Sequence, residues 1–124
     1  MNLDGRVALV TGAASGAGLK GVPGIAAYVA SKHALIGITR NAAIEYAGRG
    51  IRVNAVAPGA IETPLIAAES DERRAHFARM MPTGRLGTPQ EVADTVAFLL
   101  SDEASYISGT VVEIDGAYMQ ASPS

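Results

Sequence analysis

Short apolar runs separated by longer, more polar stretches mark three candidate strands in this chain. Residues Arg6 to Thr11 enclose the run Val-Ala-Leu-Val, and an unbroken apolar run of this length is typical of a strand buried on both faces. A second run extends from Ile51 to Ala57, where Pro58 and Gly59 stop it. A third covers about Thr110 to Ile114. The pattern therefore predicts three strands.

Helical periodicity occupies much of the sequence between these runs. From about Ala26 to Tyr46, small and apolar residues recur at helical spacing, and Gly48 and Gly50 end the segment. The recurring positions are Ala27, Ala30, Ala34, Leu35, Ile38 and Ala42. This spacing predicts one long helix after the first strand.

Two further helical segments are expected between the second and third strands. Glu62 to Met81 is charged and helix-prone, with one proline near its start and another just past its end. Thr88-Pro89-Gln90-Glu91 then combines a capping threonine, a proline at the first helical position and a glutamate at the third. The helix that begins there is predicted to reach Ser101 and to bury the stripe Val92, Val96, Leu99 and Leu100.

This alternation of strands and helices indicates an α/β fold. Strands separated by helices imply right-handed crossovers and a parallel sheet. With 124 residues the chain has the length of one small domain. We therefore expect residues 1–124 to form a single domain.

Composition excludes several functional classes. The chain has no cysteine, so it has neither a disulfide framework nor a thiolate metal site, and its first residues lack the features of a signal peptide. No apolar stretch approaches the ~20 residues of a membrane span. The 10 basic and 12 acidic side chains leave a net charge of −2, which gives no electrostatic basis for nucleic-acid binding. His33 and His76 lack partners at metal-ligand spacing. We expect a cytoplasmic protein with no metal, membrane or nucleic-acid partner.

Candidate chemistry lies at the start of the long predicted helix. Tyr28 and Lys32 are four residues apart, so a helix places both on one face. A phenol is a weak acid at neutral pH, and a neighbouring cation favours its ionised form. Ser15 could then hold a substrate oxygen beside the phenol. On its own, however, a tyrosine and lysine at this spacing more often represent a core aromatic and a solvated lysine.

The surrounding motifs resolve that ambiguity. They are Thr11-Gly12-Ala13-Ala14-Ser15-Gly16-Ala17-Gly18, Arg52-Val53-Asn54-Ala55-Val56-Ala57-Pro58-Gly59 leading to Thr63, Ile107-Ser108-Gly109, and Glu113-Ile114-Asp115-Gly116-Ala117. In this order the motifs resemble the short-chain dehydrogenase/reductase family, whose members move hydride between NAD(P) and a carbonyl or alcohol. The resemblance extends over nearly every residue of the chain but not over the whole family fold, and it implies a truncated, three-layer Rossmann-like fold.

The resemblance also implies roles for individual residues. It assigns Tyr28 as the general acid/base, Lys32 as the cation that tunes the tyrosine and binds the nicotinamide ribose, and Ser15 as the group that orients the reacting oxygen. Pro58, Gly59, Ile61 and Thr63 match the loop along the nicotinamide and pyrophosphate of NAD or NADP. Gly12 is a weaker cofactor candidate. The family's mobile substrate lid corresponds to residues 62–81, for which a solvated surface helix is an equally good interpretation.

A large internal part of the family pattern is absent. Between the glycine-rich motif and Tyr28 the sequence has no counterpart of the second strand or of the ribose-binding acidic residue. After Gly18, two glycines and a proline within residues 21–24 leave no room for the helix that normally follows a phosphate-binding turn. We interpret this as a splice around Ala14-Ser15-Gly16, which leaves Ser15 in the position of the catalytic serine and makes Gly12 a turn residue.

Two functional hypotheses follow from this interpretation. The first is a reduced oxidoreductase that acts on a small carbonyl or alcohol substrate and binds its cofactor weakly, because the adenine half of the site is missing. The second is a non-catalytic remnant that acts through protein contacts. Under either hypothesis the open sheet edge and the uncovered apolar surface predict a homo-oligomer.

Overall fold

The three apolar runs form one parallel sheet in a computed structural model that describes residues 7–10 and 24–121. The strands are β1 (Val7–Val10), β2 (Arg52–Pro58) and β3 (Val111–Ile114), in the order β1-β2-β3. All three predicted strands are confirmed. β1 pairs directly with β2, the strand that follows the long helix.

β2 is the central strand and carries much of the core. Its register places Val7 of β1 opposite Arg52, and Ala55 opposite Val111 of β3. Residues 53–57 are all buried, as expected for a parallel strand covered on both faces. The sheet is therefore organised around the sequence that was predicted as the second strand.

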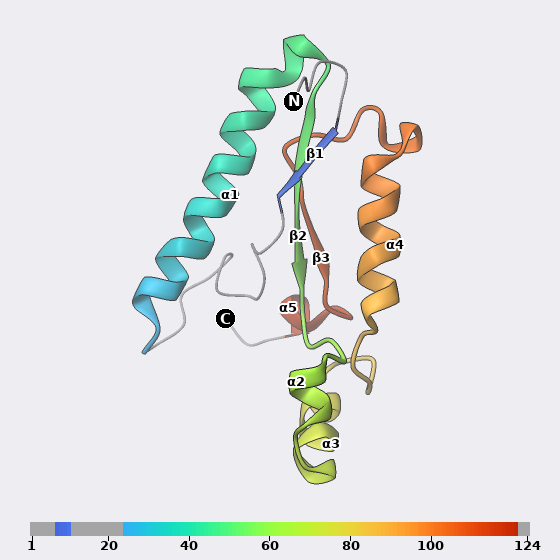
Figure 1. Cartoon of the computed structure of the whole chain (residues 1–124). Coiled ribbons are helices and arrows are strands. Elements are labelled where there is room, and N and C mark those ends of the chain that lie inside the picture. Colours follow the sequence, from blue (N-terminus) through green and yellow to red (C-terminus); the bar gives the residue numbers. More distant parts are fainter. Residues whose placement is uncertain (1–6, 11–23, 122–124) are drawn as a thin grey trace.

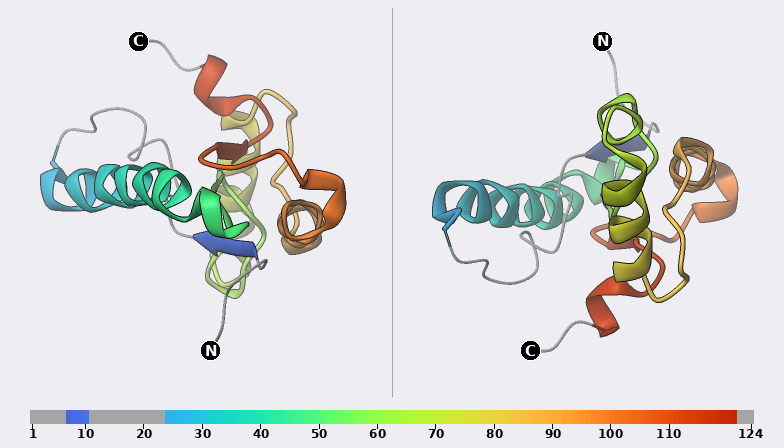
Figure 2. Two further views of the ribbon diagram at one scale, coloured as in Figure 1. Left: turned by 90° about the horizontal axis from the view of Figure 1, so that it is seen from above. Right: turned by 90° about the horizontal axis from the view of Figure 1, so that it is seen from below.

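Helices cover both faces of the sheet and give three layers, as expected. α1 (Ala26–Tyr46) continues into a short 3₁₀ turn, η2 (Ala47–Arg49), and packs against β2. α4 (Pro89–Leu100) packs against β1 and β2 from the opposite side, and the views in Figures 1 and 2 show the sheet between the two helices.

The two connections in the sheet have opposite hands, so the expectation of right-handed crossovers is wrong for the second. The strand order runs in one direction, while α1 and α4 lie on opposite faces (Figure 2). The crossover through α1 is right-handed and the one that includes α4 is left-handed. The handedness preference arises in tight units in which one helix directly follows its strand. Between β2 and β3 two further helices precede α4, so that constraint is relaxed.

The charged segment at 62–81 forms two helices rather than one. α2 (Pro64–Ala67) ends before Ser70, and the side chain of Ser70 accepts a hydrogen bond from the backbone N–H of Arg73 to cap α3 (Asp71–Met80). A 3₁₀ turn, η3 (Asp102–Ala104), follows α4, and a short helix, α5 (Tyr118–Ala121), follows β3. Figure 1 shows α2 and α3 together at the end of the molecule where β2 ends.

The buried faces of the helices differ in detail from the predicted stripes. On α4, Leu99 is 2% exposed, whereas Leu100 is 45% exposed and does not belong to the buried stripe. On α1 the buried residues are Ile36, Thr39 and Ala43, while Ile38 is 59% exposed. α1 therefore carries apolar residues on its outer side as well as against the sheet.

Polar side chains of β2 attach the segment before β3 to the sheet. Arg52 donates to the carbonyl oxygens of Leu99, Ser101 and Ile107 at 2.7 to 3.1 Å. Asn54 has no exposed surface; its amide donates to the Ile107 carbonyl at 2.9 Å, and its oxygen accepts from the Thr110 N–H at 3.2 Å. The Arg-Val-Asn motif thus has a structural role at the amino end of β2.

Among the described residues, no helix is long and apolar enough to cross a membrane.

Candidate functional site

The carboxyl ends of β2 and β3 lie at the same edge of the sheet, which is also where α1 begins (Figure 1). In parallel α/β sheets, ligands bind outside the carboxyl ends of the strands. Three loops meet at this edge, and we call residues 58–63, 85–88 and 114–117 the loop cluster. The predicted residues on α1 and in the loop after β2 therefore lie at the same edge of the sheet.

Tyr28 and Lys32 are neighbours in the first two turns of α1, as their spacing predicts. The ammonium nitrogen of Lys32 lies over the ring of Tyr28, 4.9 Å from its centroid. A cation in this position is attracted to the negative face of the ring. Tyr28 is 42% exposed, so a ligand from solvent can reach its side chain.

Pro58 and Gly59 end β2 in close contact with the loop after β3. The Gly59 N–H donates to the carbonyl oxygen of Ile114 at 2.9 Å. A Cβ on Gly59 would lie 2.8 Å from the Cβ of Asp115, which is closer than side chains approach, so only glycine fits. The Asp115 carboxylate in turn accepts from the N–H groups of Ala117 and Met119, both at 3.0 Å. These contacts fix the position of Gly59.

Ile61 and Thr63 follow in the same loop and are fixed by different contacts. Ile61 forms an isolated parallel bridge with Gly87, in which the Gly87 N–H donates to Ala60 at 2.9 Å and the Gly87 carbonyl accepts from Glu62 at 2.8 Å. Thr63 caps α2, its hydroxyl accepting from the N–H of Ile66 at 3.4 Å. The loop after β2 is thus paired with residues 85–88.

Several hollows border these loops, and two of them are lined by Pro58 and Gly59. The first, of about 510 Å³, is open to solvent. It is lined by Pro58, Gly59, Ala60, Ile61, Thr63, Leu65, Ile66, Pro89 and Val92. The second, of about 210 Å³, lies between α3, α5 and the end of β2. Its apolar lining includes Phe77, Met80, Met81, Tyr118 and Met119. All four predicted cofactor-loop residues line the first hollow, which is within the usual size range of ligand pockets.

The structure does not bring every predicted residue into one cavity. Neither hollow is lined by a residue of α1, so Tyr28 and Lys32 share only the sheet edge with the loop after β2. The predictions for Gly12 and Ser15 fall outside the described residues.

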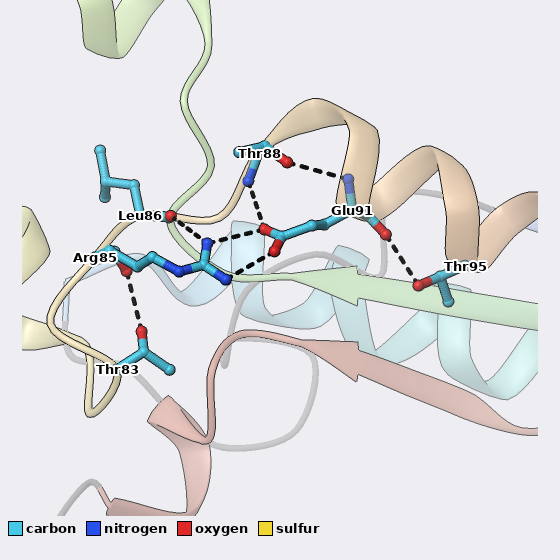
Figure 3. A network of polar contacts seen from close by, with 6 residues as sticks. All are labelled: Thr83, Arg85, Leu86, Thr88, Glu91 and Thr95. Carbon is cyan, nitrogen blue, oxygen red and sulfur yellow. Dashed lines mark hydrogen bonds and ion pairs between the residues drawn. The ribbon is translucent and has the colours of Figure 1, made fainter.

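An ion pair that the sequence pattern does not predict supports the loop cluster. The guanidinium of Arg85 donates to both carboxylate oxygens of Glu91, at 2.7 and 3.1 Å, and to the Leu86 carbonyl at 3.1 Å (Figure 3). Glu91 also accepts from the Thr88 N–H at 2.9 Å, while its own N–H donates to the Thr88 hydroxyl at 3.2 Å. The capping motif was evident in the sequence, but the partner of its carboxylate was not.

These contacts change the ionisation of the pair. Hydrogen bonds from Arg85 and then from the Thr88 backbone lower the pKa of Glu91 to about 2. The same hydrogen bond and the charge of Glu91 raise the pKa of Arg85. Both side chains therefore remain charged over the range in which proteins normally function.

Comparison with known proteins gives consistent results. A family model described as enoyl-(acyl carrier protein) reductase matches residues 2–119. Cyclohexanol dehydrogenase of Acinetobacter sp. (strain SE19) is 53% identical over 109 residues, which are 88% of this chain and 42% of that enzyme. The chain therefore spans less than half the length of this curated relative.

Two solved structures are similar in fold as well as in sequence. One, titled ElxO with NADP bound, has a TM-score of 0.82 and 37% identity over 92% of this chain and 46% of its own. The other, 4-hydroxyisoleucine dehydrogenase complexed with NADH, has a TM-score of 0.78 and 34% identity over 94% and 47%. In both, the match covers a little less than half of a longer Rossmann-type chain.

Proposed function

The chain belongs to the short-chain dehydrogenase/reductase family, and we propose that it transfers hydride between NAD or NADP and a small carbonyl or alcohol substrate. The observation that carries this proposal is the position of the Lys32 ammonium over the Tyr28 ring, at the helix start that shares an edge with the loop after β2. In reduction, the carbonyl carbon receives the hydride and the carbonyl oxygen receives a proton; in oxidation both leave the alcohol.

In this proposal Tyr28 is the proton donor and acceptor. Its hydroxyl gives a proton to the carbonyl oxygen during reduction and removes one from the alcohol during oxidation. The Lys32 ammonium, which lies over the Tyr28 ring, would supply the positive charge beside the reacting group and bind the nicotinamide ribose. Ser15 would orient the substrate oxygen with its hydroxyl. The nicotinamide ring, when bound, supplies or accepts the hydride.

The hollow beside β2 fits the nicotinamide half of such a cofactor. It is lined by Pro58, Gly59, Ile61 and Thr63, which offer an apolar surface for a flat ring and a hydroxyl at its rim. The close approach of Gly59 to Asp115 keeps this lining free of side-chain bulk. These residues would hold the nicotinamide end. Within residues 7–10 and 24–121 the structure has no strand between β1 and α1 that could bind the adenine ribose. We therefore propose weak cofactor binding.

The substrate class proposed here is an apolar alcohol or ketone. The hollow of about 210 Å³ adjoins Pro58 and Gly59, and its lining is dominated by methionine, phenylalanine and tyrosine side chains. Adaptable methionine side chains suit a compact apolar ring. One curated relative is named for the dehydrogenation of cyclohexanol, a substrate of that kind.

Homo-oligomer formation is part of the same proposal. On α1, Ile38 and Ile44 are 59% and 79% exposed, and β1 and β3 are the outer strands of the sheet. Exposed apolar side chains and open strand edges favour association. Sedimentation at micromolar concentration tests the oligomer, and a stable monomer at that concentration contradicts it.

We also propose a cytoplasmic location, which the absence of cysteine supports.

Cofactor titration tests the function directly. Quenching of protein fluorescence and enhancement of NADH or NADPH fluorescence should show saturable binding, and Lys32→Ala should weaken it by about tenfold or more through loss of the cation. Arg40→Ala is the matched control, since Arg40 is an exposed cation further along α1. If millimolar cofactor gives no binding to the unaltered chain, the oxidoreductase proposal fails and the non-catalytic remnant is left.

A further inference from the structure

The loop that lines the proposed nicotinamide hollow is hydrogen-bonded to the segment that leads into α4. Its link is residue 87: the Gly87 N–H donates to Ala60, and its carbonyl accepts from Glu62. A Cβ on Gly87 would lie 2.7 Å from the Cδ1 of Ile61 and 3.6 Å from a carboxylate oxygen of Glu91. Gly87 is thus packed between the proposed cofactor loop and the Glu91 side chain.

Glu91 and Arg85 hold residues 85–88 from both ends of this short segment. The carboxylate of Glu91 binds the Thr88 N–H on one side and the Arg85 guanidinium on the other (Figure 3). The guanidinium also donates to the carbonyl of Leu86, the residue directly before Gly87. A two-point contact between planar groups restrains geometry more than a single contact does. The ion pair therefore closes a short ring of chain around Gly87.

We propose that Arg85 and Glu91 are positioning residues for the cofactor, acting through Gly87 on the loop at 59–63. They touch no reacting atom; they set the place of Ala60 and Ile61, which line the hollow, and of the Glu62 backbone that joins these residues to Thr63. This inference rests on the proposed function, because it gives a role to a pair that would otherwise serve only the start of α4.

Two readouts in the same variants test this role. In Glu91→Ala, the amides of Gly87 and Glu62 should exchange with solvent about tenfold faster, while amides in the centre of β2 keep their protection. The dissociation constant for NADH or NADPH, measured where the variant is fully folded, should rise about tenfold. Glu91→Gln keeps a carbonyl acceptor for the Thr88 N–H and should recover part of both effects.

Arg85→Lys separates geometry from charge. Lysine keeps the positive charge but cannot make the two-point contact, so this variant should resemble Glu91→Ala rather than the unaltered chain. Glu69→Gln is the matched control. It removes an exposed ion pair at the start of α3, in which Arg73 Nε lies 3.1 Å from a carboxylate oxygen of Glu69. This pair has no link to Gly87. It should change neither readout.

The outcomes are distinct. An unchanged dissociation constant in folded Glu91→Ala and Arg85→Lys overturns the positioning role while leaving the proposed function in place. Unchanged exchange at Gly87 and Glu62 overturns it as well, because the loop would then be held without the pair. If the unaltered chain binds no cofactor, the proposed function fails, and the positioning role of Arg85 and Glu91 fails with the same result.

Discussion

Two helices begin near the carboxyl edge of the sheet, and they begin in very different ways. α4 starts with a reciprocal capping box between Thr88 and Glu91 and a proline at its first position. α1 starts at Ala26; its cap residue, Ile25, makes no side-chain capping bond, and its first turn has no acidic residue. The cap residues also differ in backbone, with ψ of 153° at Thr88 and 45° at Ile25.

This difference separates the two halves of the candidate site. The half that we assign to the cofactor, the loop cluster, is cross-connected by the Gly59, Gly87 and Arg85 contacts. The half that we assign to proton transfer is carried by an exposed helix start. A prearranged loop binds a ligand without first ordering itself, whereas exposed first turns of a helix fray readily. Pocket geometry and proton-transfer chemistry thus depend on regions of unequal local stability.

The largest expected effect comes from substituting two glycines, one in the loop cluster and one on α1. Gly59→Ala would place a Cβ 2.8 Å from the Cβ of Asp115 and 3.0 Å from its Cα, so the loop cluster has to separate. We expect the free energy of unfolding to fall by about 2 kcal/mol, the usual result of overpacking. Gly37→Ala on α1 meets nothing within 4 Å and should instead raise it by about 0.5–1 kcal/mol, because alanine is the better helix former.

Urea denaturation of both variants gives the comparison. A loss in Gly59→Ala no larger than a few tenths of a kcal/mol would show that the loop cluster can move apart freely. That result would remove the contrast between the two halves of the site.

The features that could be predicted from sequence are those with local signals. α1 has the predicted bounds because its periodicity and the following glycines are contiguous in the chain. The start of α4 was predicted because Thr88 and Glu91 lie within one turn. Tyr28 and Lys32 were predicted as neighbours for the same reason, since a helix fixes the relation between positions four residues apart.

The features that were missed depend on partners across a turn or across the sheet. Arg85 is six residues from Glu91, outside the range of any helical pattern, and its role needs the fold of the intervening loop. The burial of Leu99 rather than Leu100 depends on the angle at which α4 lies on the sheet. The left-handed crossover likewise follows from which face α4 occupies, and no local motif specifies that face.

A second test removes the capping side chain of α4 and adds one to α1. Thr88→Ala removes the hydroxyl that accepts from the Glu91 N–H, and should lower the free energy of unfolding by about 1 kcal/mol. Ile25→Asp supplies α1 with the cap and the negative charge that it lacks, and should raise it by about 0.5 kcal/mol. The gain is smaller because the backbone at Ile25 must first rotate toward the extended conformation found at Thr88. Thermal unfolding followed by circular dichroism measures both, and equal responses of the two helices would contradict the contrast.

The smallest expected effect is a pH dependence located in the loop cluster. Contact with Arg85 and the Thr88 backbone lowers the pKa of Glu91 from 4.5 to about 2, so the folded chain holds this proton less tightly than the unfolded chain. The resulting stabilisation is complete above about pH 4.5 and is lost as the pH falls through about 2. Urea denaturation between pH 6 and pH 2.5 gives the free energy of unfolding of the unaltered chain and of Glu91→Gln. The difference between these two values should become smaller as the pH falls, by a modest amount because the pair is exposed to solvent.

Gly37→Ala changes no titrating contact, so its difference from the unaltered chain should stay constant over the same pH range. A Glu91→Gln difference that also stayed constant would mean that the carboxylate gains nothing from Arg85, and the loop cluster would then owe its rigidity to backbone contacts alone.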